Sequence, residues 1–460
     1  MDGPDLAERV DAVMSAALGE PVAIEDLTHL PGGASKDTWS FAARGAGGEV
    51  RAFVLRRDRA GGGSAASGLP HEAALLEAAA EADVPVPRVV AAGGDLGGQS
   101  GPFIVMDFVD GETIPRRILR DEEWAAIRPA LAGQCGEILA AIHRIPAASV
   151  PGLVGGDLLD QLRGQLDQLG QPHPAFELGL AWLAENRPPP VEAHVVHGDF
   201  RNGNLIVGAD GVRAVLDWEL AHLGDPLEDL GWLCVKAWRF GSTLPVGGFG
   251  TTEQLVAAYE GAGGGPVDEA ALRWWIAFGT LRWGIICIAQ TLTHVSGVVR
   301  SVELAAIGRR VCEVESDLLE LLPWGARDLA APAADSPVGW SGTPHDVPSA
   351  VELLDAVREF LESDVLTATE GRVRFHVRVA ANVVGMVGRE LEIGGELAAA
   401  HAERLARLGV ASEAELAAAI RSGGFDHRLA EVSDAVRATV AGKLAVANPR
   451  YGRPPAGPPA

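Results

Sequence analysis

The segment that most constrains this chain covers residues 197–204 and continues to Asp217. Asp199 and Asn204 lie on one short loop of this segment, so a single backbone conformation positions both side chains. An apolar triplet, a Gly-Ala-Asp-Gly turn and a second apolar run follow, and together they predict a β-hairpin over 205–216. The hairpin returns Asp217 to the loop. The sequence therefore predicts that three polar side chains converge from about twenty residues of chain.

These three side chains suit phosphoryl transfer, in which the protein mainly positions the reactants and stabilises charge. Asp199 can orient and deprotonate a hydroxyl group. Asn204 and Asp217 can hold Mg²⁺, which prefers one or two protein oxygens together with phosphates and water. We therefore expect the core of a kinase-type phosphoryl transferase. The alternative is a solvated Asp/Asn loop beside an ordinary hairpin, which does not by itself require this order of residues.

Residues 194–232 resemble the aminoglycoside phosphotransferase family, and most closely its branch that also occurs fused to acyl-CoA dehydrogenases. The sequence at 224–230 resembles the segment that usually follows the motif in this family. The resemblance implies an α+β, protein-kinase-like two-lobed fold with a mixed α/β N-lobe and a mainly helical C-lobe. It also implies ATP or GTP with Mg²⁺, and a small molecule with a hydroxyl group as the phosphate acceptor.

The resemblance assigns Asp199 as the catalytic base and Asn204 and Asp217 as the metal ligands. It gives Asp225 and Asp229 structural roles, capping a helix and bracing the catalytic loop.

Arg201 stands two residues after Asp199, where eukaryotic protein kinases carry a lysine that contacts the transferring phosphate. We predict that Arg201 is a catalytic residue that clamps the γ-phosphate bidentately. The alternative is an exposed arginine that pairs with a nearby carboxylate.

A small-residue turn in the N-terminal part can cradle phosphates with its backbone N–H groups. The next strand ends at Arg56, where most kinase-like folds carry a phosphate-binding lysine, and the resembling branch often has arginine. Arg57 and Arg59 are close enough to leave this register open. Glu72 is the candidate ion-pair partner, or else a solvated helix glutamate. The residues of the turn expected to bind the nucleotide are Gly32, Gly33, Ala34 and Ser35.

The apolar run at 103–109 resembles the hinge between the lobes of a kinase. The adenine would pack there and bond the backbone near Asp107 to Val109. The side chains of the run are mostly core whatever the function.

Composition indicates an enzyme of the cytoplasm. The formal net charge of −24 argues against a nucleic-acid backbone or an anionic membrane as partner. The four cysteines have no metal-ligand spacing and are expected to be reduced core residues. The N-terminus lacks a basic region and an apolar region, so we expect no signal peptide. The apolar stretch at 274–290 contains Arg282 and is expected to be a buried helix.

The chain divides by composition near an Ala/Pro/Ser/Gly-rich stretch, beyond which the pattern is helical. Helices are expected at about 373–392, 394–408, 412–421 and 427–447, in a region that resembles a small helical domain of unknown function found beside such kinases. The protein partner of that domain is unknown. The expected parts are an N-lobe at 1–110, a C-lobe at 111–329, a linker at 330–348, an all-α accessory domain at 349–451 and a disordered tail at 452–460.

Two other classes stay open. A nucleotide-binding regulator or pseudokinase would keep the fold without turnover, and Arg56 is the departure that could support it. A scaffolding protein centred on the accessory domain is the other. The intact set of Asp199, Asn204 and Asp217 favours an active small-molecule kinase.

Overall fold

The computed structural model describes residues 4–30, 36–58, 68–96, 101–299, 301–324 and 350–451. The predicted phosphate-binding turn, linker and tail lie outside the described residues. By contact, the chain divides into two compact units, 1–156 with 188–276 and 157–187 with 277–460. These units do not follow the expected domain boundaries, which stay a prediction, because the helices of 157–187 pack with the C-terminal helices.

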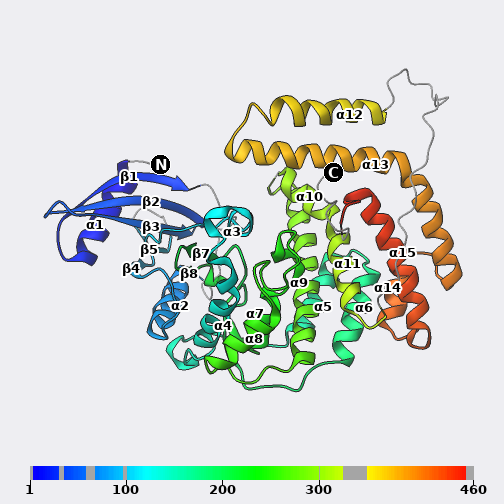
Figure 1. The fold of residues 1–460 in the computed structure, drawn as a ribbon, viewed down its shortest axis with the longest axis horizontal. Coiled ribbons are helices and arrows are strands. Elements are labelled where there is room, and N and C mark those ends of the chain that lie inside the picture. Colours follow the sequence, from blue (N-terminus) through cyan, green and yellow to red (C-terminus); the bar gives the residue numbers. More distant parts are fainter. Residues whose placement is uncertain are drawn as a thin grey trace. The chain divides into compact units, whose positions relative to one another are not determined.

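The first unit begins with a five-stranded antiparallel sheet in the order β1-β2-β3-β5-β4 (Figure 1). The strands β2 and β3 form a long hairpin in which Thr38 lies opposite Arg56. Phe41 and Leu55 point to one face of this hairpin and are buried, as the period of two along a strand requires. The strands are β1 (Val22–Leu30), β2 (Lys36–Gly45), β3 (Val50–Asp58), β4 (Val89–Gly93) and β5 (Phe103–Asp107).

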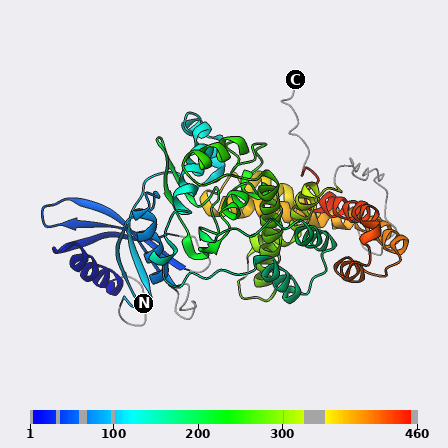
Figure 2. The ribbon, with the colours of Figure 1, turned by 90° about the horizontal axis from the view of Figure 1, so that it is seen from below.

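Two helices cover opposite faces of this sheet, α1 (Pro4–Leu18) and α2 (Leu69–Glu81). Alternate residues of β5 show the division. Phe103 and Val105 belong to the hydrophobic cluster that contains the buried residues of α1. Ile104 and Met106 belong to the cluster that contains the buried residues of α2. Figure 2 shows α1, in dark blue, lying along the strands.

The rest of the first unit is mainly helical and contains two short antiparallel strand pairs. The strand β7 (Leu205–Gly208) pairs with β8 (Gly211–Val215), which forms the predicted hairpin, and β6 (His194–Val196) pairs with β9 (His222–Gly224). The longer helices are α3 (Pro115–Arg120), α4 (Leu131–Ile142), α7 (Leu227–Leu233), α8 (Thr252–Gly261) and the first part of α9 (Glu269–Val295).

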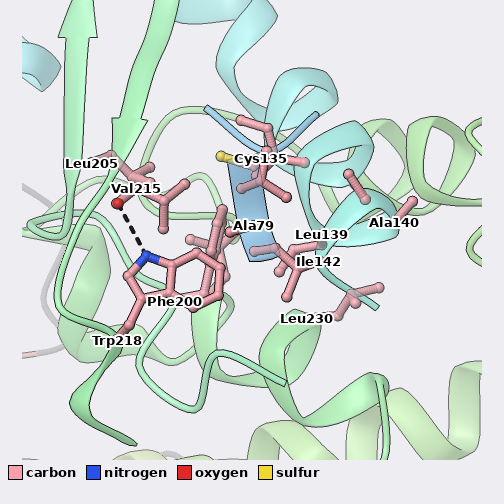
Figure 3. Packing of buried hydrophobic residues seen from close by; sticks show 14 of the residues in the cluster. Ala79, Cys135, Leu139, Ala140, Ile142, Phe200, Leu205, Val215, Trp218 and Leu230 are labelled. Carbon is pink, nitrogen blue, oxygen red and sulfur yellow. Dashed lines mark hydrogen bonds between the residues drawn. The ribbon is translucent and has the colours of Figure 1, made fainter. Parts of the chain in front are cut away.

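Two large aromatic side chains anchor the hairpin and its preceding loop in the core (Figure 3). Phe200 is 0% exposed and Trp218 is 1% exposed, and both pack in the cluster that includes Leu139 of α4. The indole Nε1 of Trp218 donates a hydrogen bond of 3.2 Å to the carbonyl oxygen of Val215. Asp199 precedes Phe200 and Asp217 precedes Trp218 in the chain. The backbone of both aspartates is therefore held in place by the buried aromatic residue that follows.

The second unit consists of helices. The expected helices at 373–392 and 394–408 are wrong as two elements, because the structure has one continuous helix, α13, over both. Gly394 and Gly395 each cost about 1 kcal/mol relative to alanine in a helix, yet neither blocks a backbone hydrogen bond as proline would. The helices are α5 (Leu158–Leu169), α6 (Pro174–Glu185), the rest of α9, α10 (Val302–Arg309), α11 (Val311–Leu321), α12 (Ala350–Phe360), α13 (Gly371–Leu408), α14 (Glu413–Arg421) and α15 (Leu429–Ala447).

The C-terminal helices are bonded to α6 and α11 within the second unit. Arg421 at the end of α14 donates to Glu177 of α6 at 2.5 Å. Lys443 of α15 lies 3.4 Å from the buried carboxylate of Glu315 on α11. The hydroxyl of Tyr451 donates to Asp317 at 2.6 Å. The region expected as an accessory domain therefore packs through charged contacts with helices that precede it in the chain.

Within the described residues, α9 is the one helix long and apolar enough to cross a membrane by length and composition, and 50% of its apolar window is buried in the fold. A buried core helix passes the same test. The four cysteines are free and buried, as expected.

Candidate active site

The loop that carries Asp199 is held at its first residues by Asp229 of α7. Its carboxylate accepts hydrogen bonds from the backbone N–H of His197 at 2.7 Å and of Gly198 at 2.9 Å. Gly198 has φ +75° and an added Cβ would lie 2.4 Å from a carbonyl oxygen, so only glycine fits this turn. Burial favours a raised pKa for Asp229, but the hydrogen bonds and charges of His143 and His197 together lower the pKa.

Both aspartates of the segment after the hairpin make the hydrogen bonds expected of structural residues. Asp225 accepts from the backbone N–H of Leu227, the first residue of α7, at 2.9 Å. Asp229 is further fixed by His143, whose Nε2 lies 3.2 Å away and whose Nδ1 lies 2.9 Å from the hydroxyl of Tyr259. A buried network of this kind sets the path of the loop that leads to Asp199.

His197 ties the loop to the end of the hairpin. Its Nδ1 accepts from the backbone N–H of Asp199 at 3.1 Å, so its Nε2 donates to the carbonyl oxygen of Leu216 at 3.0 Å. Burial lowers the pKa of His197, which favours the neutral ring that this pairing requires. The N–H of Leu216 also donates to the carbonyl oxygen of Asn204 at 2.8 Å. Asp217, the next residue, is therefore placed beside Asn204.

The carboxylate of Asp199 is held by three side chains. Its Oδ1 accepts from the indole Nε1 of Trp232 at 2.8 Å and from Nε of Arg201 at 3.1 Å. Its Oδ2 accepts from the amide of Asn204 at 2.6 Å. These three contacts hold the carboxylate of Asp199 in a single orientation. Trp232 lies 33 residues further along the chain, and nothing in its local sequence indicated this contact.

Arg201 pairs with Asp199 and packs on an aromatic side chain. The centre of its guanidinium group lies 4.6 Å from the ring of Trp238, which in turn contacts the ring of Trp232 at 5.2 Å. The carboxylate-paired arrangement was one of the two alternatives for Arg201. A contact of Arg201 with a phosphate stays a prediction.

Asp217 has a left-handed backbone conformation with φ +69°, which is uncommon for a residue with a side chain. Such strain is concentrated at functional sites, where the surrounding structure maintains it. Asn204 is 5% exposed, whereas the side chain of Asp217 is 38% exposed. An amide oxygen and a carboxylate are hard ligands of the kind that Mg²⁺ takes, so this donor set fits the metal.

The described residues contain no group of three or more His, Cys, Asp or Glu side chains arranged to hold a metal without other ligands. Mg²⁺ bound to a nucleotide does not need such a group, since phosphates and water complete its coordination.

Three charged side chains, Lys36 and Arg56 of the sheet and Glu72 of α2, meet the end of the hairpin at Asp217 and Glu219. Arg56 forms ion pairs with Glu72 and, at 3.3 Å, with Asp217. Lys36, at the start of β2, lies 2.7 Å from Glu72 and 3.0 Å from Glu219. The expected ion pair of Arg56 with Glu72 is thus present, while Lys36 and Glu219 were not identified from the sequence.

The structure also resolves which arginine of β3 points to the site. Arg57 projects to the other face, where its guanidinium lies 4.4 Å from the ring of Trp39 and 3.6 Å from Asp37. Arg56 is therefore the residue beside Glu72. Arg59 lies outside the described residues.

At the expected hinge, the carboxylate of Asp107 forms an ion pair of 2.8 Å with the exposed side chain of Arg88. The backbone N–H of Asp107 donates to the carbonyl oxygen of Arg88, and the backbone N–H of Phe108 donates to the carbonyl oxygen of Ala52. These two N–H groups are already used within the sheet. The predicted adenine contact would therefore use other backbone groups of this run.

Comparisons with known proteins agree with this arrangement. Residues 26–275 match the family described as the phosphotransferase enzyme family, and residues 367–451 match a domain of unknown function. A solved structure from Ralstonia eutropha assigned as an aminoglycoside phosphotransferase has a TM-score of 0.54 and 22% identity, covering 68% of this chain and 97% of that chain. At this identity the likeness establishes the protein-kinase-like fold alone.

The chain is also similar in sequence to curated proteins. Acyl-CoA dehydrogenase family member 10 of Mus musculus is 29% identical over 43% of this chain, and family member 11 of Gallus gallus is 34% identical over 33% of this chain. The matches span only 19% and 21% of the length of these two relatives. Viomycin phosphotransferase of Streptomyces vinaceus is 27% identical over 46% of this chain and 77% of its own length. Because the family match covers more than half of the chain, this protein belongs to the phosphotransferase enzyme family, as its catalytic motif predicted.

Proposed function

We propose that this protein transfers the γ-phosphoryl group of ATP or GTP to the hydroxyl group of a small molecule. One observation carries the proposal. The side-chain amide of Asn204 donates a hydrogen bond of 2.6 Å to the carboxylate of Asp199. The backbone hydrogen bond from Leu216 to Asn204 brings the next residue, Asp217, close to Asn204. A base and two oxygen ligands for magnesium therefore adjoin, which is the constellation that phosphoryl transfer requires.

In the proposed reaction Asp199 orients the acceptor hydroxyl and takes its proton as the oxygen attacks the γ-phosphorus. The products are a phosphate ester and the nucleoside diphosphate, with the proton first on Asp199 and then released to solvent. Asn204 and Asp217 would hold Mg²⁺, which supplies positive charge against the phosphates. We propose that Arg201 contributes a further positive charge at the transferring group once it exchanges its contact with Asp199 for the phosphate.

For the acceptor, we propose a hydroxyacyl-CoA-like molecule or a related small alcohol. The support is the similarity to proteins named as acyl-CoA dehydrogenase family members, while the similarity to viomycin phosphotransferase supports a small-molecule acceptor in general. A cytoplasmic location and the absence of a nucleic-acid or membrane partner stay predictions.

The test is a transfer assay on the purified full chain with MgATP and MgGTP. The acceptors are hydroxyacyl-CoAs with the hydroxyl at different carbons, the matching free hydroxy acids, amino alcohols, sugars and viomycin. Products are identified by mass spectrometry as acceptor plus one phosphate. A hydroxyacyl-CoA phosphate formed faster than any other product supports the acceptor class. Transfer to another acceptor would retain the kinase and reject the acyl class, and no transfer with any acceptor would reject the proposed activity.

Trp232→Phe is expected to lower kcat about tenfold while leaving the KM for the nucleotide unchanged. Phenylalanine keeps a smaller aromatic ring, but the N–H that donates to Asp199 is lost, and a hydrogen bond to a charged group contributes about 1.5–3 kcal/mol. Steady-state kinetics on the best acceptor measures the effect. Trp274→Phe, at a buried tryptophan of α9, is the matched control and should leave kcat within twofold. Equal losses in both variants would indicate a general packing effect.

A nucleotide-binding regulator is the second candidate, and a specific contact favours it. Asp199 and Asp217 are both paired with arginines, Arg201 and Arg56, that a substrate and a metal would have to displace. Tight MgATP binding without turnover on any acceptor would select this function.

A further inference from the structure

The positive charge beside the hairpin does not come from β3 alone. Lys36 is the first residue of β2 and lies opposite Asp58, while Thr38 lies opposite Arg56. Opposite residues of an antiparallel pair, and alternate residues of a strand, project to the same face of the sheet. Lys36 and Arg56 therefore share the face that is directed toward α2 and the hairpin.

The side chain of Lys36 is enclosed in this position. The residue is 6% exposed, and its ammonium group lies 2.7 Å from Glu72 and 3.0 Å from Glu219. Glu72 is itself 2% exposed and also binds Arg56. Burying a lysine costs free energy, and pairing with carboxylates offsets this cost only in part. The buried position of Lys36 is therefore not explained by stability alone.

A single cation would be enough to neutralise Glu72, yet the structure gives it two. With Asp217 and Glu219, the cluster has three carboxylates against two cations. Removal of the charge on Lys36 would leave one cation among the three carboxylates, an environment that repels a polyphosphate.

Both cations keep N–H donors for a further acceptor. Arg56 bonds Glu72 through one terminal nitrogen and Asp217 through the other, which uses two of its five N–H donors. An ammonium group has three N–H donors, and two carboxylate contacts leave one for a further acceptor. In sequence, Lys36 directly follows the small-residue segment Gly32 to Ser35 that is predicted to cradle phosphates.

We propose that Lys36 binds the phosphates of the nucleotide directly, and that Glu72 positions both Lys36 and Arg56 for this purpose. The ligand class is a nucleoside di- or triphosphate. Lys36 thus supplies from β2 the compact point charge that β3 lacks, because Arg56 occupies the position of the usual lysine. The inference rests on the proposed function, since it assigns a residue to the nucleotide site of that reaction.

The experiment compares binding of MgATP, MgADP and adenosine to the full chain by calorimetry. Lys36→Met keeps a long side chain and removes the charge. We expect it to weaken MgATP and MgADP binding about 10- to 100-fold, the effect of one charge-assisted contact, and to leave adenosine binding unchanged. Lys36→Arg should recover part of the loss. Arg44→Met, at an exposed residue of the same strand that pairs with Glu25, is the matched control and should change none of the affinities.

The adenosine measurement separates the phosphate contact from a structural role. If Lys36 only braces Glu72, Lys36→Met will lower adenosine and ATP binding together, or neither, and either result overturns the inference. Should Lys36→Met not fold, the ratio of ATP to adenosine affinity in Lys36→Gln decides in the same way. Absence of ATP binding by the wild-type chain would overturn the proposed function first, and this result differs from a failure limited to the variants.

Discussion

Asp199→Asn is expected to lower kcat for phosphoryl transfer by about 10²- to 10⁴-fold, the range of a lost general base. An amide cannot take the proton of the acceptor hydroxyl. The shape of the side chain is kept, so the loop should stay bound to Asp229 through His197 and Gly198. The measurement is single-turnover transfer from MgATP to the best acceptor, which separates the chemical step from product release.

Binding of MgATP is the control for this variant, and its Kd should change less than threefold. The amide of asparagine has one acceptor oxygen, while Trp232 and Asn204 donate to opposite oxygens of Asp199, so one donor will lose its partner. A thermal-unfolding measurement accounts for this local cost. Turnover within tenfold of wild type would mean that another group takes the proton, and the assignment of Asp199 as the base would be wrong.

How far the sequence predicts this site depends on how far apart in the chain the partners lie. Asp199, Asn204 and Asp217 are joined by one loop and one hairpin, so counting residues was sufficient to bring them together. Trp232 and Lys36 reach the site through packing of separate elements. A tryptophan in a helix and a lysine at the start of a strand occur in many proteins without a role in a site. No local sequence pattern therefore distinguishes a residue that contacts Asp199 or Glu72.

The fold shows the same limit. The predicted strand that ends at Arg56 is present as β3, which continues to Asp58, and one face of β3 is buried in a continuous apolar cluster. The break expected between residues 392 and 394 was wrong, since local helix propensity is a weak term that the packing of a 38-residue helix overrides. Propensity locates elements, whereas tertiary contacts decide where they end.

Asp217→Asn is expected to lower kcat/KM by about 10²- to 10³-fold at fixed Mg²⁺ and to raise the Mg²⁺ concentration needed for half-maximal rate at least tenfold. Removing one carboxylate charge from a metal site loses several kcal/mol of charge stabilisation in the transition state. Asparagine is the suitable substitution, because it tolerates the left-handed conformation at φ +69° that other side chains adopt at a cost. The loss therefore reports the charge and not the backbone.

Asp210→Asn is the matched control, since Asp210 lies in the exposed turn of the same hairpin and pairs with Arg213. Its rate and Mg²⁺ dependence should equal those of the wild-type chain. In Asp217→Asn the guanidinium of Arg56 loses a charged partner and one negative charge near the phosphates is removed, so binding of metal-free ATP should strengthen or stay constant. If the Mg²⁺ dependence of Asp217→Asn matched that of the control, Asp217 could not be a metal ligand, and the negative charge beside Arg56 would serve only to orient that arginine.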